Sequence, residues 1–158
     1  FNEAWLLADT DDVFPDDEQL MKNEVTKIEQ IETVTERYEN GNIKCTYSGG
    51  IADDGRFLLH GEEKWFYPFG ELMTECTYKL GAKVGQYVHY DVKGNKVWEW
   101  EYLEDNIAIY KTYHKNNNLK SVGRYVNRIA EGWAERYSSD GKVVSKVLFK
   151  NGKIVKSD

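Results

Sequence analysis

From Thr33 onward the chain alternates short mixed apolar and polar stretches with sequences typical of tight turns. Asn-Gly and Asp-Gly pairs supply the positive φ angles that tight hairpins require. Residues of this kind recur at 39–42, 53–55, 69–70, 93–95, 116–118, 140–141 and 151–152. The stretches between them are too short for crossover connections, so successive strands must be antiparallel neighbours. The pattern predicts strands at 33–39, 42–48, 57–67, 71–79, 84–91, 95–103, 107–114, 118–126, 130–138 and 142–150, with 153–156 as a frayed edge.

These turns belong to a repeat. Gly70, Gly94, Asn117 and Gly141 are separated by 24, 23 and 24 residues, and each is followed eight residues later by an aromatic residue: Tyr78, Tyr102, Tyr125 and Phe149. A second series, with the same period, consists of Gly61, Gly85, Ile109 and Gly132. Each of these residues is followed five positions later by a residue with a ring side chain. Such regularity marks stacked copies of one unit. The prediction is a mainly β fold, an elongated single antiparallel meander sheet built of consecutive β-hairpin repeats of about 24 residues.

The first 32 residues do not share this pattern, which divides the chain into an acidic N-terminal extension at 1–32 and a repeat domain at 33–158. Asp16 and Asp17 are suited to cap a short helix, and apolar residues then recur at helical spacing as far as Ile31. A strand starting near Val25 is the competing interpretation, because the stretch is rich in Thr, Val and Ile. About five extra residues around 48–55 are expected to bulge out as a loop.

Charge is distributed unevenly along the chain, whose formal net charge is −6. Residues 1–41 carry 12 acidic and 3 basic side chains, residues 42–110 carry 11 and 7, and residues 111–158 carry 4 and 11. Solvated faces that differ between the ends are one explanation. A sharper one is that the acidic N-terminus contacts a basic partner or folds back on the basic C-terminal repeats. Nucleic acid is an unlikely partner for a chain of this overall charge.

The absence of a long apolar run argues against a membrane span. The expectation is a soluble protein, either cytoplasmic or exported after removal of an N-terminal leader. Cys45 and Cys76 are predicted to lie roughly 10 Å apart with one strand between them, which is too far for a disulfide.

Residue patterns typical of catalysis are missing from the sequence. It contains no phosphate-binding glycine loop, no Cys/His spacing typical of a metal site and no nucleophile elbow. His60, His89 and His114 are scattered, and His114 occupies a position that is aromatic in the other copies, which favours a packing role. We therefore expect no enzyme activity, no cofactor and no metal.

Aromatic side chains are the remaining candidates for function. Alternation along the strand puts Trp98, Trp100 and Tyr102 on one face. Residue counting along the repeat makes Tyr110 equivalent to Trp133, and Trp65 equivalent to Tyr113. Stacking along the sheet is the simpler role for such rings. Trp98 and Trp100 nevertheless depart from the repeat. The other copies have Thr or Ser at the position of Trp98, and Cys, Gly or Val at the position of Trp100. The predicted binding groove consists of Trp65, Trp98, Trp100, Tyr110, Tyr113 and Trp133.

The repeat unit resembles the MORN repeat in its bacterial variant form. The resemblance is carried by Tyr67-Pro68-Phe69-Gly70-Glu71-Leu72, Tyr78-Lys79-Leu80-Gly81 and Gly85, and it returns around 90–102 and 137–153. It covers roughly residues 38–156, about four and a half copies, and implies an elongated, twisted sheet of consecutive hairpins.

The resemblance implies no catalytic residues. Bacterial proteins with this repeat often carry a YwqK-like antitoxin label, and other MORN proteins serve as scaffolds or membrane-associated binding modules. The leading hypothesis is therefore a non-enzymatic scaffold that mediates protein–protein interaction. The alternatives are an antitoxin-like protein that neutralises a toxin, and a module that binds a glycan or a membrane surface.

Overall fold

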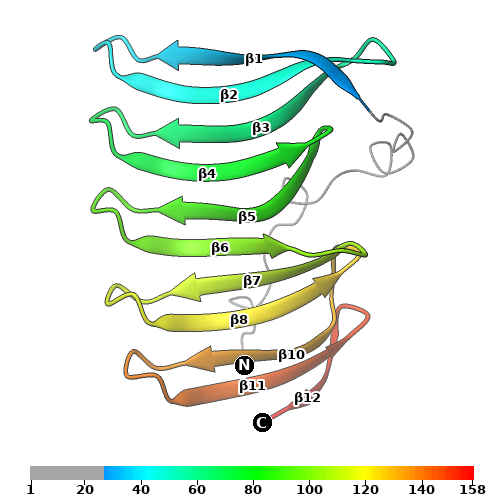
Figure 1. Cartoon of the computed structure of the whole chain (residues 1–158). Helices are drawn as coiled ribbons and strands as arrows, with labels where there is room; N and C mark the ends of the chain where they lie inside the picture. The colour runs from blue at the N-terminus through cyan, green and yellow to red at the C-terminus, as the bar shows by residue number, and fades with distance from the viewer. Residues whose placement is uncertain (1–26) are drawn as a thin grey trace.

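The computed structural model describes residues 27–158, which form one antiparallel sheet with strands that follow one another in chain order (Figure 1). The order is β1-β2-β3-β4-β5-β6-β7-β8-β10-β11-β12, and the short β9 pairs with β8. The predicted meander is confirmed. The strands are β1 Ile28–Arg37, β2 Ile43–Ala52, β3 Phe57–Phe66, β4 Leu72–Lys79, β5 Ala82–Tyr90, β6 Lys96–Tyr102, β7 Ile107–Tyr113, β8 Leu119–Val126, β9 Ile129–Ala130, β10 Gly132–Tyr137, β11 Val143–Lys150 and β12 Lys153–Ser157.

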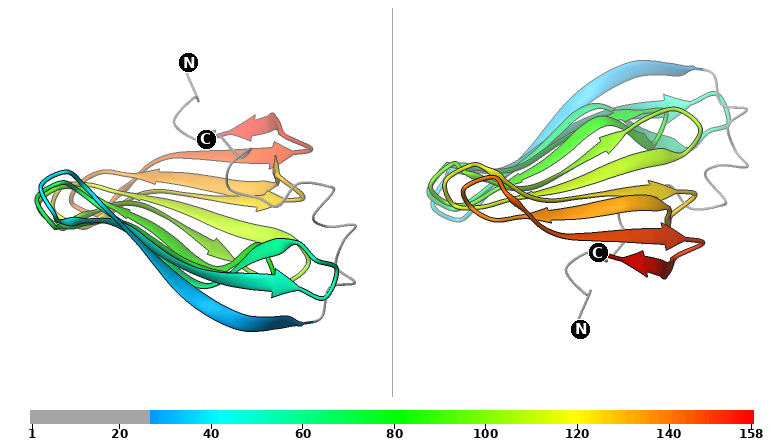
Figure 2. Two further views of the ribbon diagram at one scale, coloured as in Figure 1. Left: turned by 90° about the horizontal axis from the view of Figure 1, so that it is seen from above. Right: turned by 90° about the horizontal axis from the view of Figure 1, so that it is seen from below.

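One rim of the sheet is a row of five turns with the same hydrogen bonds. In the turn after β3, Tyr67 N donates to Glu71 O at 2.8 Å and Gly70 N donates to Tyr67 O at 2.9 Å. The same pair of bonds closes the turns that begin at Tyr38, Asp91, His114 and Ser138. Figure 2 shows these turns stacked at one end of the molecule while the strands fan out from them, as expected for a twisted sheet.

The fourth residue of each of these turns needs a positive φ. Glycine supplies it in four turns, and Asn117 supplies it in the remaining one with φ 70°. Asparagine tolerates this left-handed conformation better than most residues. The turn around Asn117 therefore keeps the geometry of the others although its glycine is missing.

The change of period from 24 to 23 residues has its origin in a β-bulge. In β5 the ladder to β4 passes from Val84 to Tyr87, so two residues are inserted opposite the Cys76–Thr77 step. In β7 the ladder to β6 runs without a shift from Ala108 to Thr112. Losing the bulge removes these two residues, and the β6–β7 connection regains one: Lys79 pairs with Ala82 across two residues, whereas Leu103 N donates to Ile107 O across three. The net change is one residue.

Counted from the turns, Ala108 takes the place that Gly85 occupies in the preceding copy. Ala108 lies six residues before His114, as Gly85 lies six residues before Asp91. The series that placed Ile109 at this position is therefore wrong by one residue.

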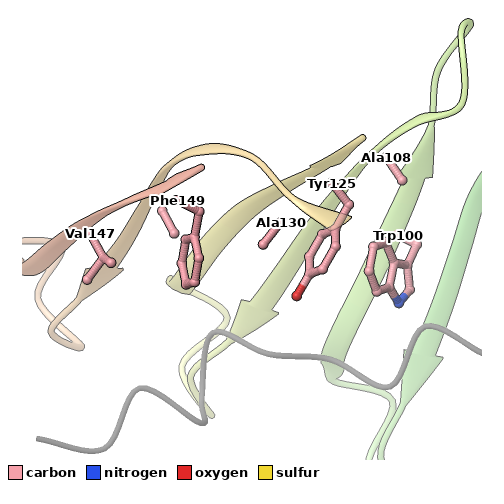
Figure 3. Close-up of a cluster of buried hydrophobic side chains, with 7 residues drawn as sticks. Trp100, Ala108, Tyr125, Ala130, Val147 and Phe149 are labelled. Carbon is pink, nitrogen blue, oxygen red and sulfur yellow. The ribbon is translucent and has the colours of Figure 1, made fainter. Parts of the chain in front are cut away.

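The two faces of the sheet differ in chemistry. We call one the aromatic face: it carries the buried cluster Trp100, Ala108, Tyr125, Ala130, Ala134, Val147 and Phe149. Figure 3 shows side chains of this cluster on one side of the ribbon. We call the other the charged face, because its central row of paired positions includes Lys64, Glu75, Glu99, Lys111, Glu135 and Lys146.

Two expectations about the first strands need correction. Most of the expected helix lies outside the described residues, but residues 28–31 belong to β1, so a helix reaching Ile31 is wrong. The extra residues near 48–55 do not bulge out; β2 and β3 continue as a ladder to Ile51 and Phe57 and are joined by a turn in which Gly55 N donates to Ala52 O at 2.9 Å. Gly49 permits this because a Cβ there would lie 2.4 Å from Leu58 O of β3.

Candidate functional site

The predicted groove residues were expected to share one face, and four of them do. Trp98 is the register partner of His89 and Thr112, and Trp100 is the partner of Tyr87 and Tyr110. Register partners in neighbouring strands point to the same face of a sheet. Trp65 continues the row of Trp98 through Thr74 and His89 on the two strands between them. Four of the predicted residues therefore lie on the aromatic face: Trp65, Trp98, Trp100 and Tyr110.

Trp98 and Trp100 are the centre of a continuous set of ring contacts. The Trp98 ring meets Tyr87 edge to face, with centroids 5.0 Å apart, and stacks on His89 at 5.2 Å. The Trp100 ring lies 4.6 Å from Tyr110 and 5.2 Å from Tyr125. We call these six side chains, Tyr87, His89, Trp98, Trp100, Tyr110 and Tyr125, the aromatic cluster. Each aromatic pair of this kind adds roughly 0.5–1.5 kcal/mol beyond the area that it buries.

The two tryptophans differ in burial. Trp100 is 2% exposed and is the largest of the fully buried side chains of the described residues. Trp98 is only partly buried and packs against this core from its edge. Trp100 thus has the position of a structural residue, whereas Trp98 has a surface that another molecule can contact.

A shallow groove of about 340 Å³ lies beside Trp98. Its lining combines the rings of Trp98 and Tyr110 with the polar side chains of Thr112, Lys120, Ser121 and Arg136. The Thr112 and Ser121 hydroxyls are hydrogen-bonded to each other at 2.5 Å. A mixture of rings with a few polar groups and two cations is suited to hold a peptide that carries both an aromatic and an acidic residue.

Burial controls the ionisation of the groups around the cluster. Burial raises the pKa of the Tyr110 hydroxyl, and the nearby Tyr125 raises it further. Burial also lowers the pKa of His89, and this effect outweighs the opposite effect of the Asp91 carboxylate. Both shifts favour the neutral side chain. The aromatic cluster therefore presents an uncharged surface near neutral pH, bordered by Lys120 and Arg136.

Tyr113 and Trp133 do not join the others. Tyr113 reaches the edge of the groove, but its hydroxyl donates to Glu99 Oε1, on the charged face. Trp133 is 39% exposed, and its ring lies 4.5 Å from Lys146 Nζ, also on the charged face. Both placements follow from the position of each residue relative to its turn. Tyr113 lies one residue before its turn, as Phe66 does, and Trp133 lies five residues before its turn, as Ile109 does, so matching Tyr113 to Trp65 and Trp133 to Tyr110 was one position out of register.

Four functional candidates were not found from the sequence: Tyr87, His89, Lys120 and Arg136. Tyr87 and His89 could have been found by counting back from Trp100 and Trp98 across the β5–β6 turn, because register fixes their partners. Lys120 and Arg136 reach the groove from β8 and β10, and only the fold brings them there.

The described residues show no arrangement that suggests catalysis. Among residues 27–158, no group of three or more His, Cys, Asp or Glu side chains could hold a metal ion. Cys45 and Cys76 are both free and buried, as expected from the strand between them. No helix in this part of the chain has the length and apolar character needed to cross a membrane.

Three segments of the chain match the family model described as MORN repeat variant: residues 59–80, 108–127 and 131–151. They coincide with the β3–β4, β7–β8 and β10–β11 hairpins. Over these three hairpins the chain is similar to the MORN repeat. Repeats of this type are commonly modules that bind proteins or membranes. No curated protein sequence matches the chain.

The MORN matches leave out the β1–β2 hairpin and also the β5–β6 hairpin, at 82–102, although its fold is the same as that of the matched hairpins. This hairpin contributes Tyr87, His89, Trp98 and Trp100, most of the aromatic cluster. One of the two hairpins that the family model does not match is thus the copy that carries most of the candidate site.

Proposed function

We propose that the protein is a non-enzymatic MORN-repeat scaffold that binds another protein through the groove beside Trp98. The observation that carries this proposal is the departure of Trp98 and Trp100 from the repeat. In the other copies, the position equivalent to Trp98 is occupied by Thr74, Ser121 and Ser145. These copies form the same sheet without a large ring at that position. A second tryptophan is not needed for the fold, and a partly exposed one favours recognition.

The physical basis is that tryptophan and tyrosine dominate the binding energy of protein interfaces. Such rings bury a large area at little cost in conformational entropy, and residues of this kind are enriched among those whose truncation costs about 2 kcal/mol or more. Trp98 is held by Tyr87 and His89, so little freedom remains to be lost on binding. Lys120 and Arg136 at the groove favour a partner segment with acidic side chains.

Narrower roles are distinguished by what binds. One stoichiometric partner encoded near this protein would support an antitoxin-like role, and several partners would support a general scaffold. The exposed edge strand β12, with Lys153 and Lys156, suits an anionic surface as the less favoured alternative. Retention on anionic liposomes or polysaccharide, unchanged in the Trp98→Ala variant, would support that alternative instead.

The test is affinity capture from native lysate with three immobilised chains: the natural one, Trp98→Ala and Trp133→Ala. Trp133 is a matched control because it is a partly exposed tryptophan on the opposite face. The proposal expects a stoichiometric protein on the natural chain and on Trp133→Ala, and its loss on Trp98→Ala. Equal capture by all three chains would contradict a role of the Trp98 groove.

A further inference from the structure

The charged face changes sign along the sheet. Eight residues after the start of its rim turn, the β3–β4 hairpin has Glu75 and the β5–β6 hairpin has Glu99, whereas the β10–β11 hairpin has Lys146. Four further cations lie at this C-terminal end of the face, all with exposed side chains: Arg124, Lys150, Lys153 and Lys156. Among the described residues, no carboxylate lies within ion-pair distance of these four. This end of the charged face therefore offers positive charge to another molecule.

Trp133 connects these cations with the edge of the sheet. The other copies have no ring at its position, which is occupied there by Glu62, Gln86 and Ile109. Trp133 pairs in register with Leu148, and Leu148 pairs with Lys156, so this row runs across β10, β11 and β12. The centroid of the Trp133 ring lies 4.5 Å from Lys146 Nζ and 5.9 Å from Lys156 Nζ. Because contact with an aromatic ring orients an ammonium group without neutralising it, these two cations are held beside the outer strand.

The outer edge of β12 is open to a further strand. Among the described strands β12 pairs only with β11, and it lies at the end of the sheet (Figure 1). Asp158 and Lys146 exchange both backbone hydrogen bonds, at 2.8 and 3.2 Å. Successive residues of a strand direct their backbone groups to opposite sides, so the N–H and C=O of Ser157 point outward. Outward groups of this kind are what an added peptide strand binds.

The open edge and the charge together select an acidic peptide. Lysines on an edge strand oppose pairing with a second basic edge, including that of another copy of this chain. They favour a strand that carries carboxylates on the same face, because unlike charges on neighbouring strands stabilise the pair. Nucleic acids and polysaccharides supply negative charge but no peptide backbone to continue the ladder. On the opposite face Ile154 is 44% exposed, which suits apolar or β-branched residues at the alternate positions of the added strand.

We propose that the edge of β12 is a docking site for an acidic, extended segment of another protein. The segment adds a strand beside β12 and places its carboxylates next to Lys153 and Lys156 on the charged face. This contact is separate from the Trp98 groove, which lies on the aromatic face, so Trp98→Ala leaves it unchanged. Either contact can therefore fail its test without the other.

The probe is a fluorescein-labelled peptide of alternating Glu and Thr, titrated into the full chain by fluorescence anisotropy at low salt. Its fully N-methylated counterpart carries the same charge but has no backbone N–H, so it should bind at least about 10-fold more weakly. Lys153→Gln/Lys156→Gln should weaken binding of the first peptide by roughly 5- to 20-fold. The matched control Lys93→Gln/Lys115→Gln removes the same charge from exposed lysines of the rim turns and should bind as the natural chain does.

Hydrogen exchange gives a second readout on the natural chain. At saturation the peptide should slow exchange of the outward Ser157 amide by at least about 10-fold, while the Lys146 amide, already bonded to Asp158, stays as it is. Ser157→Ala keeps the outward N–H and should bind normally, whereas Ser157→Pro removes it and should not bind.

Several outcomes would overturn the proposal. Equal binding of the N-methylated peptide, or equally strong competition by a sulfated polysaccharide, would mean that the patch recognises charge alone. Equal weakening in Lys93→Gln/Lys115→Gln would assign the effect to the overall charge of the chain. The absence of binding, or an unprotected Ser157 amide at saturation, would also exclude an added strand.

Discussion

Replacing Trp100 by alanine tests the assignment of this residue to the core. Trp100 is 2% exposed, so the substitution removes nearly the whole indole from a packed environment. A buried tryptophan removes about 150–250 Å² from water. At about 25 cal/mol per Å² this corresponds to roughly 4–6 kcal/mol, and truncations of buried tryptophan cost about 3–5 kcal/mol. We expect a loss of roughly 3–5 kcal/mol in the free energy of unfolding.

For a chain of this size, 1 kcal/mol corresponds to about 2–4 °C in Tm. Trp100→Ala should therefore melt roughly 6–20 °C below the natural chain in calorimetry, with Trp100→Phe in between. Trp133→Ala is the matched control: its ring is 39% exposed and its contact with Lys146 contributes only about 0.5–1 kcal/mol. A Trp100→Ala melt within 2 °C of the natural one, on the order of 1 kcal/mol or less, would refute the packing role. So would an equal loss in Trp133→Ala.

Three further predictions concern single groups. Asn117→Gly should raise stability by about 0.5 kcal/mol in urea titrations, because glycine adopts the φ of 70° without strain; lower stability would mean that the asparagine side chain has another role. Tyr113→Phe should cost about 1–3 kcal/mol by the same assay, because it removes the hydrogen bond that the Tyr113 hydroxyl donates to the buried Glu99 carboxylate; an unchanged midpoint would contradict this. Burial raises the pKa of Tyr90 and of Cys76 to about 12 in the folded chain, from 10.0 and 9.0. The folded state thus holds these protons more tightly than the unfolded state does. The stabilisation that results is complete below about pH 9 and is lost as the pH rises toward 12, so Tm should fall over this range. A Tm that does not change with pH over this range would refute the burial of these groups.

The strands and turns could be predicted because their signals are local. Gly70 and its equivalents mark the turns, and the short stretches between them permit only hairpins. The ladder from Ala108 to Thr112 shows what could not be predicted: whether β7 carries a bulge depends on its pairing with β6. A residue count that puts the lost residue in the wrong place assigns Tyr113 and Trp133 to the wrong face.

The candidate site was predictable to the same extent. Trp98 and Trp100 stood out because they interrupt a repeat, and alternation within one strand placed them correctly on one face. Lys120 and Arg136 could not be found, because their positions beside Trp98 depend on the packing of three hairpins. The same limit applied to residues 48–55, where Gly49 allows β2 and β3 to approach closely and their ladder continues.

The proposed role of the aromatic face is tested most directly by calorimetric titration of the captured partner against the natural chain, Trp98→Ala and Trp133→Ala. The prediction is that Trp98→Ala weakens binding by about 30-fold or more, which corresponds to about 2 kcal/mol, while its melting curve stays cooperative and Trp133→Ala binds as the natural chain does. Unchanged affinity in Trp98→Ala, or equal weakening in Trp133→Ala, would contradict it.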